Sequence, residues 1–208
     1  MREQWSDLHV FWLNTGAAYD EVAAYMERIR ALVPNFHEIP GAQQLSIEQF
    51  GWPADVVPVS ATRDGHSVHG TKGLMFQSYL QCCARSIWVP MYEAMVKYGV
   101  THIYRGQRRS DTRRAPITSG TVVDGITYLF PIEDWTREQV FSYCHEHCHE
   151  WIPPYYESGE RTSRDCWNCT AYLDDNVERI NALPTERRVA VISVINELRA
   201  VVARTMEV

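Results

Sequence analysis

The sequence predicts a single α/β domain with a mostly parallel sheet flanked by helices. Segments typical of strands alternate with segments of helical periodicity, which is the pattern of parallel α/β folds. The 208 residues have the length of one domain, and we expect one domain over residues 1–208. Hydrophobic residues make up 45% of the chain and charged residues 22%, which is enough for an ordinary buried core.

Composition excludes several classes of protein. Twenty Lys and Arg against 26 Asp and Glu give a net charge of −6, which disfavours a general nucleic-acid-coating protein. No apolar run approaches the roughly 18 residues of a membrane span, and no signal peptide opens the chain, so we expect a cytoplasmic protein with no membrane contact. Six cysteines are too few for a disulfide framework, and in a reducing compartment they indicate metal or redox chemistry.

The first half of the chain contains two predicted strands and one clear helix. An apolar run over 8–13 predicts a buried strand. Residues 20–33 place apolar side chains on one helical face, and Pro34 ends that helix. The β-branched run 56–59 predicts a second strand or extended segment, and 65–73 a polar loop.

The second half continues the alternation. A long helix is predicted over 74–98, interrupted near Pro90, and a short strand follows over 100–104. An Asp-Gly pair in the middle of 121–129 predicts a β-hairpin. Residues 136–148 predict a helix.

The C-terminal part is expected to hold a loop and a final helix. Residues 153–169 predict a loop, since prolines and polar residues interrupt every periodic pattern there. A helix beginning after Pro184 is expected over about 185–205, with an apolar stripe along one face.

A dense run of arginines follows the strand predicted over 100–104. Residues 105–114 carry five arginines against one aspartate, a local charge of +4 in an acidic chain. Open α/β sheets bind ligands beyond the carboxyl ends of their strands, and guanidinium groups bind phosphate or sulfate oxygens in pairs. We therefore predict a local anion pocket; the alternative is a solvated charged loop.

Four cysteines fall into two pairs. Cys82 and Cys83 are adjacent on a predicted helix, and Cys166 and Cys169 form a C-x-x-C pair in a loop. A C-x-x-C pair is a common metal clamp, and an iron–sulfur cluster takes four thiolates. We favour one four-thiolate site over the alternative that Cys82 and Cys83 are small buried apolar residues.

The segment 144–149 is a rival metal candidate. Cys144 and Cys148 are spaced i,i+4 on a predicted helix, and so are His145 and His149, a spacing that can hold zinc. We favour an ordinary helix with an exposed His/Glu face.

Several motifs together resemble, in order, those of the sulfonucleotide reductases, the phosphoadenylyl-sulfate and adenylyl-sulfate reductases of the adenine-nucleotide α-hydrolase-like superfamily. The resemblance spans about residues 8–172 and implies a Rossmann-like fold. The matching segments are Phe11–Gly16, Cys82-Cys83 with Pro90, Tyr104–Arg109 with Arg113 or Arg114, Pro131–Thr136, Ile152–Tyr156 and Cys166–Thr170.

The resemblance also implies a cofactor and a ligand. In the iron–sulfur branch the two cysteine pairs bind a [4Fe–4S] cluster, so the implied ligands are Cys82, Cys83, Cys166 and Cys169, with zinc as the alternative metal. The implied ligand is an adenine nucleotide or a sulfonucleotide-like anion. Its implied binding residues are Asn14, Thr15, Gly16, Arg105, Gly106, Arg108, Arg109, Arg113 and Arg114.

The sequence departs from the family at four points. Residues 1–7 are too few for the family's first strand and its Ser-Gly-Gly-x-Asp-Ser phosphate loop, so we expect a fold without them. No cysteine follows Cys169 to match the nucleophile of the family's Glu-Cys-Gly-Leu-His motif. Asn14 replaces an aspartate, and Ile87 replaces a lysine. Without that thiol, attack on the sulfonate sulfur has no obvious agent, and no catalytic residue is predicted.

Three functions follow as alternatives. The favoured one is a family member reassigned from sulfate assimilation, of the kind that accompanies phages, mobile elements and type IV CRISPR loci. The second is a thioredoxin-dependent reductase whose missing parts come from an absent segment, a partner chain or an oligomer that completes the sheet. The third is a non-enzymatic, metal-stabilised scaffold whose arginine loop contacts a partner or a nucleic acid.

Overall fold

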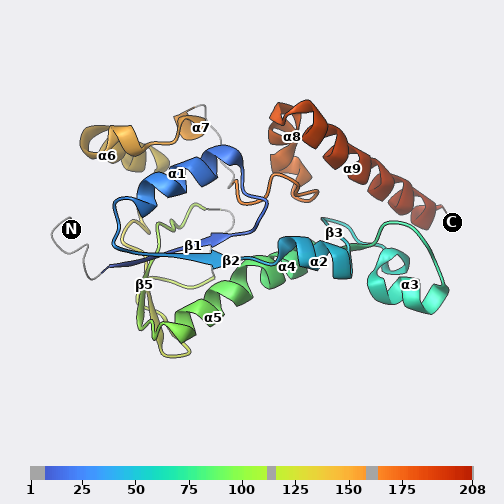
Figure 1. Ribbon diagram of the computed structural model, residues 1–208, viewed down its shortest axis with the longest axis horizontal. Helices are drawn as coiled ribbons and strands as arrows, with labels where there is room; N and C mark the ends of the chain where they lie inside the picture. Colours follow the sequence, from blue (N-terminus) through green and yellow to red (C-terminus); the bar gives the residue numbers. More distant parts are fainter. Residues whose placement is uncertain (1–7, 112–115, 158–163, 208) are drawn as a thin grey trace. The chain divides into compact units, whose positions relative to one another are not determined.

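The computed structural model describes residues 8–111, 116–157 and 164–207 (Figure 1). The chain forms two compact units. Unit 1 lies within residues 1–94 and 162–208, and unit 2 within residues 95–161. Each unit is described by itself.

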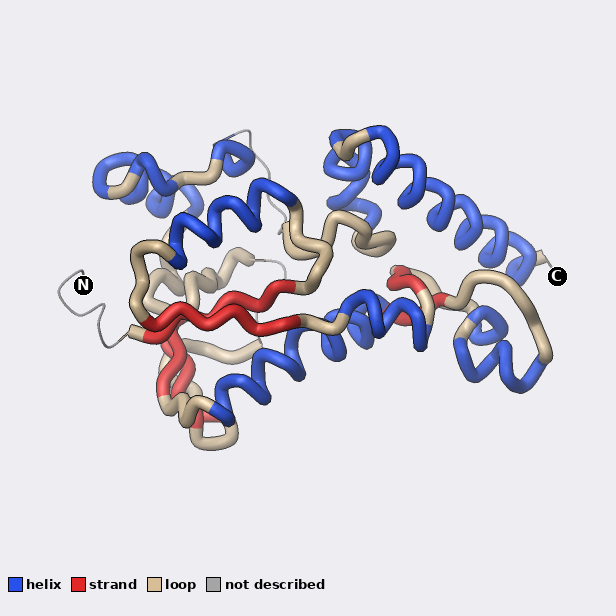
Figure 2. Tube along the Cα trace, viewed as in Figure 1, coloured by secondary structure: helices blue, strands red, loops and turns tan. Residues whose placement is uncertain are grey.

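Unit 1 contains a parallel pair of strands with a helix between them in sequence. Strand β1 (His9–Asn14) pairs in parallel with β2 (Asn35–Pro40), and helix α1 (Asp20–Arg30) makes the crossover (Figures 1 and 2). Acidic residues in the first turn of α1 and basic residues in its last turn complement the helix dipole. The predicted strand and helix are confirmed here, and β2 was not predicted.

A second parallel pair lies further along the chain in unit 1. Strand β3 (Trp52–Ala54) pairs with β4 (Phe76–Ser78), and α2 (Gln43–Phe50) precedes β3. Gly51, between α2 and β3, has φ of +92°, and a Cβ there would lie 2.1 Å from the Met75 backbone, so only glycine fits.

The segment between β3 and β4 differs in part from what the sequence predicts. The apolar run 56–59 forms no strand; of the two predicted alternatives only the extended segment fits, since Pro58 is extended and leads into a 3₁₀ turn, Val59–Ala61. The predicted polar loop 65–73 begins inside helix α3 (Arg63–His69). The side chain of Thr62 accepts a hydrogen bond from the Gly65 N–H and so caps this helix.

The predicted long helix 74–98 starts later and contains a wider turn. Helix α4 (Tyr79–Cys83) continues through a π-helical turn (Ala84–Trp88) into α5 (Val89–Lys97). Pro90 has no N–H to bond the carbonyl four residues back, at Ser86, so the interruption expected near Pro90 takes the form of this turn.

Two C-terminal helices complete the core of unit 1. Helix α8 (Leu173–Ala182) packs on α9 (Thr185–Met206), which confirms the predicted final helix. Helix α9 contributes to both hydrophobic clusters. The first is Tyr19, Ile180, Leu183, Val191 and Ile195, and the second is Ala54, Ala61, Phe76, Val194 and Leu198.

Unit 2 contains a three-stranded sheet of order β5-β7-β6. Strand β5 (His102–Tyr104) is parallel to β7 (Ile126–Leu129), which pairs antiparallel with β6 (Val122–Val123). The Asp124-Gly125 turn has positive φ at both positions, 51° and 79°, which confirms the predicted hairpin.

Helices follow the sheet of unit 2. The predicted helix is confirmed as α6 (Arg137–His147), and a 3₁₀ turn, His149–Trp151, follows it. The loop predicted over 153–169 is wrong at its start, where Pro154–Glu157 forms the short helix α7. Proline fits there because the first helical residue needs no N–H partner.

The fold is therefore mixed α/β, with small, mostly parallel sheets flanked by helices, as the sequence predicts. The described strands form three short sheets, whereas we expected one sheet. None of the helices in the described ranges is long and apolar enough to cross a bilayer.

Candidate functional site

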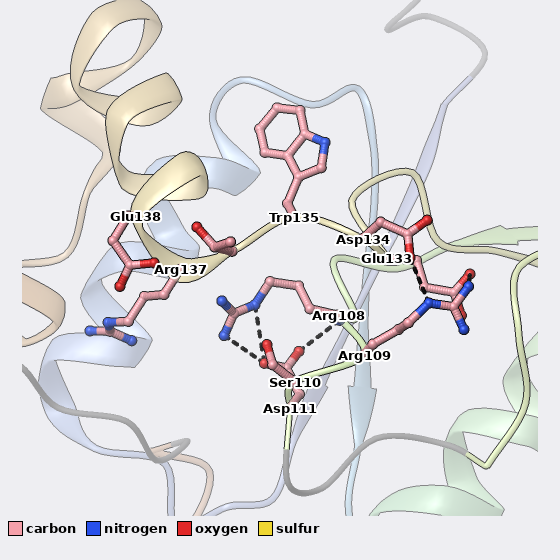
Figure 3. A pocket seen from close by; sticks show the side chains of 10 residues that line it. Arg108, Arg109, Ser110, Asp111, Glu133, Asp134, Trp135, Arg137 and Glu138 are labelled. Atoms are coloured by element: carbon pink, nitrogen blue, oxygen red, sulfur yellow. Dashed lines mark hydrogen bonds and ion pairs between the residues drawn. The ribbon is translucent and has the colours of Figure 1, made fainter.

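A cavity next to the predicted arginine loop lies entirely within unit 2. It has a volume of about 550 Å³ (Figure 3), within the roughly 300–1,000 Å³ of ordinary small-molecule sites. Its walls are the loop after β5 and the segment that joins β7 to α6. The residues that line it are Arg108, Arg109, Ser110, Asp111, Glu133, Asp134, Trp135, Thr136, Arg137 and Glu138.

Both adjacent arginines of the pocket have acidic partners. Arg108 donates from Nη2 and Nε to Asp111 Oδ1, at 2.7 and 3.1 Å, and its backbone N–H donates to Asp111 Oδ2 at 2.8 Å. Arg109 donates from Nε to Asp134 Oδ1 at 2.5 Å, and its Nη2 lies 3.5 Å from Glu133 Oε2 (Figure 3). The hydrogen bond from Arg109 to Asp134 is the main cause of a raised Arg109 pKa. The local positive charge that the loop sequence predicts is thus partly neutralised by acids from a later segment.

Glu133 is a buried carboxylate in the wall of this pocket. Its residue exposure is 8%, and its Oε2 accepts a hydrogen bond from the Ser119 N–H at 3.1 Å. Its Oε1 has no hydrogen-bond partner among the residues that the structure describes. A buried acceptor without a donor is costly, so this oxygen marks a point of unsatisfied hydrogen bonding in the pocket wall.

The start of α6 forms the opposite wall. Thr136 and Gln139 make a reciprocal capping box that fixes the first turn. The pKa of Glu138 is lowered, chiefly by a hydrogen bond from its own backbone N–H, at a helix start where carboxylates are stabilised. The ring of Trp135 packs edge-on against Tyr143, with centroids 5.5 Å apart, which anchors the wall to the helix.

The predicted arginine-loop residues do not all line the pocket. Arg108 and Arg109 line it, whereas Arg105 is exposed and pairs through its backbone N–H with Leu129 O. Gly106 lies outside the lining too, and a Cβ there would meet only the Ile132 side chain at an ordinary 3.7 Å. Arg113 and Arg114 lie outside the described residues.

The four cysteines of the predicted cluster all belong to unit 1. Cys82 and Cys83 end α4, and Cys166 and Cys169 lie at the ends of a tight turn in which Cys169 N–H donates to Cys166 O at 3.3 Å. Burial, then the charges of Cys169 and Cys82, raise the pKa of Cys83 to about 12. Burial also raises the pKa of Cys166 well above its usual range; a hydrogen bond with Thr15 opposes this shift, and the charges of Cys169 and Cys82 add to it. The thiols are therefore close enough to influence one another.

This donor set suits a thiophilic cofactor, but the side chains are not arranged around a single ion. In the described part of the chain, no group of three or more His, Cys, Asp or Glu is positioned to hold a metal ion. A tetrahedral zinc site with bonds of about 2.3 Å brings its sulfurs to about 3.8 Å from one another. A four-iron cluster needs no such approach, because each thiolate bonds a different iron. Cysteine thiols are suitable ligands for such a cluster, since metal binding favours the thiolate form.

The predicted Asn14–Gly16 segment is tied to the cysteine turn. Thr15 is buried, and its hydroxyl donates to Asp165 O at 2.6 Å and forms the hydrogen bond with Cys166. Asn14 Oδ1 accepts from the Gly16 N–H at 3.0 Å. These residues lie in unit 1 and the arginine loop lies in unit 2, so their shared role in nucleotide binding stays a prediction.

The rival segment 144–149 begins in the last turn of α6. His145 and His149 approach to 3.0 Å between their Nδ1 atoms. Burial and the neighbouring Cys148 thiol raise the pKa of Cys144. These contacts are pairwise, and the described residues show no third ligand at either pair.

The elements and sites together define a class: a mixed α/β protein with an arginine-lined pocket and four cysteines whose thiols influence one another. The chain belongs to the phosphoadenosine phosphosulfate reductase domain family, whose sequence pattern matches residues 1–172. Among solved structures it is similar to phosphoadenylyl-sulfate (PAPS) reductase from Candida auris in a phosphate complex. The identity is 13%, the match covers 77% of this chain and 72% of the other, and the TM-score is 0.47. No curated protein matches the chain.

Proposed function

We propose that this chain binds an adenine sulfonucleotide or a related adenine nucleotide in the unit 2 pocket. The observation that carries the proposal is the combination of Arg109 with the buried Glu133 in one cavity. Arg109 offers a guanidinium to a phosphate or sulfate group, and the carboxylate of Glu133, which lines the same cavity, is an acceptor for a hydroxyl or amino group. A nucleotide supplies both, whereas inorganic sulfate supplies only the first.

Titration calorimetry of the nucleotide tests this proposal. Adenosine 5′-phosphosulfate and adenosine 3′,5′-bisphosphate are expected to bind saturably, and Arg109→Ala is expected to weaken both about tenfold or more. Arg105→Ala is the matched control, since it removes an arginine from the same loop outside the pocket. Equal binding by wild type and Arg109→Ala would contradict the proposal.

Glu133→Gln separates a nucleotide site from a simple anion site. This change keeps the side-chain shape but replaces a carboxylate oxygen that can accept from a hydroxyl or amino group. Nucleotide affinity should fall, while weak binding of inorganic sulfate at the pocket should be unchanged or rise. A parallel change in both ligands would assign the pocket to anions alone.

We further propose that Cys82, Cys83, Cys166 and Cys169 hold a [4Fe–4S] cluster. The proposal is supported by the pKa shifts of Cys83 and Cys166, each of which responds to the charges of Cys82 and Cys169. When bound, the cluster would supply a one-electron redox centre at the end of α4. Thr15 would orient Cys166 through its hydrogen bond.

Metal analysis of protein purified without oxygen tests the cluster. About four iron and four acid-labile sulfide per chain are expected, with loss of both in Cys83→Ser. Cys144→Ser is the control because it removes a thiol that lies outside this group. Stoichiometric zinc without iron would contradict the cluster.

The proposed role of the bound nucleotide does not include thiol-dependent reduction by this chain. Burial raises the pKa of the Cys83 and Cys166 thiols, which makes them poor nucleophiles. We expect no sulfite release from adenosine 5′-phosphosulfate or phosphoadenosine phosphosulfate with thioredoxin. Sulfite release by the cluster-loaded protein would restore the reductase alternative.

A further inference from the structure

Two histidines lie side by side where helix α6 ends, within unit 2. His145 belongs to the last turn of α6, and His149 begins the 3₁₀ turn that follows. Their Nδ1 atoms are 3.0 Å apart, and their ring centroids are 5.1 Å apart. Both residues are exposed, so this histidine pair is open to ions from the solvent.

The backbone around the histidine pair is fixed by hydrogen bonds. The Cys148 N–H donates to Cys144 O at 2.8 Å, which closes the last turn of α6. The Trp151 N–H donates to Cys148 O at 2.9 Å, and the Ile152 N–H donates to His149 O at 3.1 Å, which together hold the 3₁₀ turn. The two imidazoles thus start from anchored positions, and little backbone entropy is lost when an ion joins them.

The separation of the two nitrogens suits one shared metal ion. Imidazole nitrogens bind such ions at about 2.0–2.1 Å, so two of them are roughly 2.9 Å apart at a right angle and roughly 3.3 Å apart at the tetrahedral angle. The observed 3.0 Å is close to the right-angle value. In the hydrogen-bonded pair one Nδ1 carries a proton, and moving that proton to Nε2 of the same ring leaves two lone pairs for an ion.

The number of ligands distinguishes one kind of metal ion from another. In the described part of the chain no third His, Cys, Asp or Glu joins the pair, so a bound ion takes water in its other positions. Structural zinc sites are tetrahedral and use four protein ligands. Ions with tetragonal geometry accept neighbouring imidazoles at a right angle, and among divalent ions nickel and copper bind nitrogen ligands strongly.

Acidic neighbours favour a cation at this end of α6. Glu146 follows His145 in the chain and Glu150 follows His149, and both glutamates are exposed. Negative charges within a Debye length lower the energy of a nearby divalent cation. We propose that the histidine pair binds a divalent transition-metal ion of the nickel or copper kind, through both Nδ1 atoms and with water in its remaining positions. The nucleotide pocket adjoins the opposite end of α6, so this proposal does not rest on nucleotide binding.

A second pair of histidines, in unit 1, is the rival position for such an ion. His9 Nδ1 and His37 Nε2 are 2.8 Å apart. The ring of His37 also stacks on Phe11, with centroids 4.9 Å apart. Burial lowers the pKa of His37, which means that its surroundings disfavour added positive charge. We therefore place the ion at the α6 pair and use His9 to test that choice.

Calorimetric titration of the untagged protein with nickel(II) nitrilotriacetate tests the site. The chelator fills four positions of an octahedral ion and leaves two at a right angle, which suits a pair of imidazoles better than a lone one. Wild type should bind one probe per chain saturably. His145→Gln and His149→Gln should each weaken binding about tenfold or more, because each leaves a single imidazole.

His147→Gln is the matched control. It removes a histidine whose side chain is 50% exposed on the same helix, at a spacing of two residues that does not share the face of His145. His9→Gln tests the rival pair, and unchanged binding in both variants supports the α6 site. No saturable binding by wild type, an equal loss in His147→Gln, or a loss in His9→Gln would overturn the proposal.

Nuclear magnetic resonance locates the ion in the wild-type protein, so the test holds even where a variant fails to fold. Octahedral nickel(II) is paramagnetic, and the ring-proton signals nearest to it shift or broaden first. The signals of His145 and His149 should change together at substoichiometric probe, before those of His147 and His9. A change that begins at His147 or His9 would place the ion elsewhere and would sink the idea.

Discussion

Arg108 and Arg109 are neighbours in sequence but offer different things to a ligand. Arg108 is 17% exposed and makes three hydrogen bonds with Asp111, so it mainly shapes its own loop. Arg109 is 53% exposed, and its acidic partners come from the segment after β7. We therefore expect Arg109 to contribute more to nucleotide binding than Arg108.

Asn14 stands where the family has an aspartate. The contacts of Asn14 give a physical reason for this replacement. Its Nδ2 donates to Glu38 Oε1 at 2.7 Å, across the β1-β2 pair. This hydrogen bond is the main cause of a lowered Glu38 pKa, and a contact with Arg30 adds to it. An aspartate at position 14 would place two carboxylates together.

Asn14→Asp is therefore expected to destabilise the protein by about 1 kcal/mol at pH 7. A lowered folded pKa means that the Glu38 contribution is present above the unfolded value of 4.5 and is lost as pH falls through the folded value. The difference between wild type and variant should accordingly shrink below about pH 4.5. Urea unfolding at pH 7 and pH 4 measures it.

The double variant Asn14→Asp with Glu38→Gln is the control for that prediction. With the second carboxylate gone, most of the penalty should disappear. A penalty that remains in the double variant would place the cause outside the Asn14–Glu38 pair.

At the scale of elements, α6 supports the pocket through its first turn. Thr136 caps that turn, and Trp135, one residue earlier, packs on Tyr143 one and a half turns into the helix. Arg137, the first residue of the helix, donates to Tyr156 O at 3.2 Å and so joins α6 to α7. The pocket wall is thus built on a capped helix rather than on a loop alone.

Thr136→Ala is expected to lower the free energy of unfolding by about 1 kcal/mol through loss of this cap. Nucleotide affinity should fall with it, because the wall formed by residues 135–138 frays. Thr136→Ser is the matched control, since serine keeps the capping hydroxyl. Chemical denaturation measures the free energy of unfolding, and calorimetry measures the nucleotide affinity. Values for Thr136→Ala equal to those of the wild type would contradict the prediction.

The sequence predicts elements whose pattern is local. Helices α1 and α6, strand β1 and the hairpin follow from periodicity and from the Asp-Gly turn. Strand β3 is not predicted because it contains Pro53, which is unusual inside a strand; its pairing with β4 stabilises it. Helix α3 escapes because its composition is polar and its cap, at Thr62, is its main local signal.

The candidate sites show the same division. The arginine loop and the cysteine pairs are visible in the sequence, whereas Glu133 and Asp134 join Arg109 only through the fold. A small cavity in unit 1 is lined by Arg164, Arg179 and Arg187. These arginines come from a loop and two helices, so no pattern in the linear sequence predicts that cavity. Sequence spacing finds groups that are contiguous, and tertiary contacts assemble the rest.

At the scale of the whole molecule, α9 stabilises unit 1 by contributing to both of its hydrophobic clusters. Val191 and Ile195 enter one hydrophobic cluster, and Val194 and Leu198 enter the other. The side chains alternate between the clusters at spacings of three and four residues, as one broad helical stripe does.

Leu198→Ala is expected to lower the free energy of unfolding by about 2–5 kcal/mol, the usual cost of emptying a packed site. Val189→Ala, on an exposed face of the same helix, should change it by about 0.5 kcal/mol or less. Guanidinium unfolding of both variants measures the difference. Similar values for the two would mean that α9 is not a core element.

The family match ends at residue 172, one residue before α8 begins. A fragment cut at that border would keep every recognisable motif but would lose the partners of Tyr19 and Phe76 in both clusters. It would expose a large apolar surface to water and would be prone to aggregate. The end of the family match and the end of the folded unit therefore do not coincide in this chain. A fragment that is to fold stably must include the last 36 residues, 173–208.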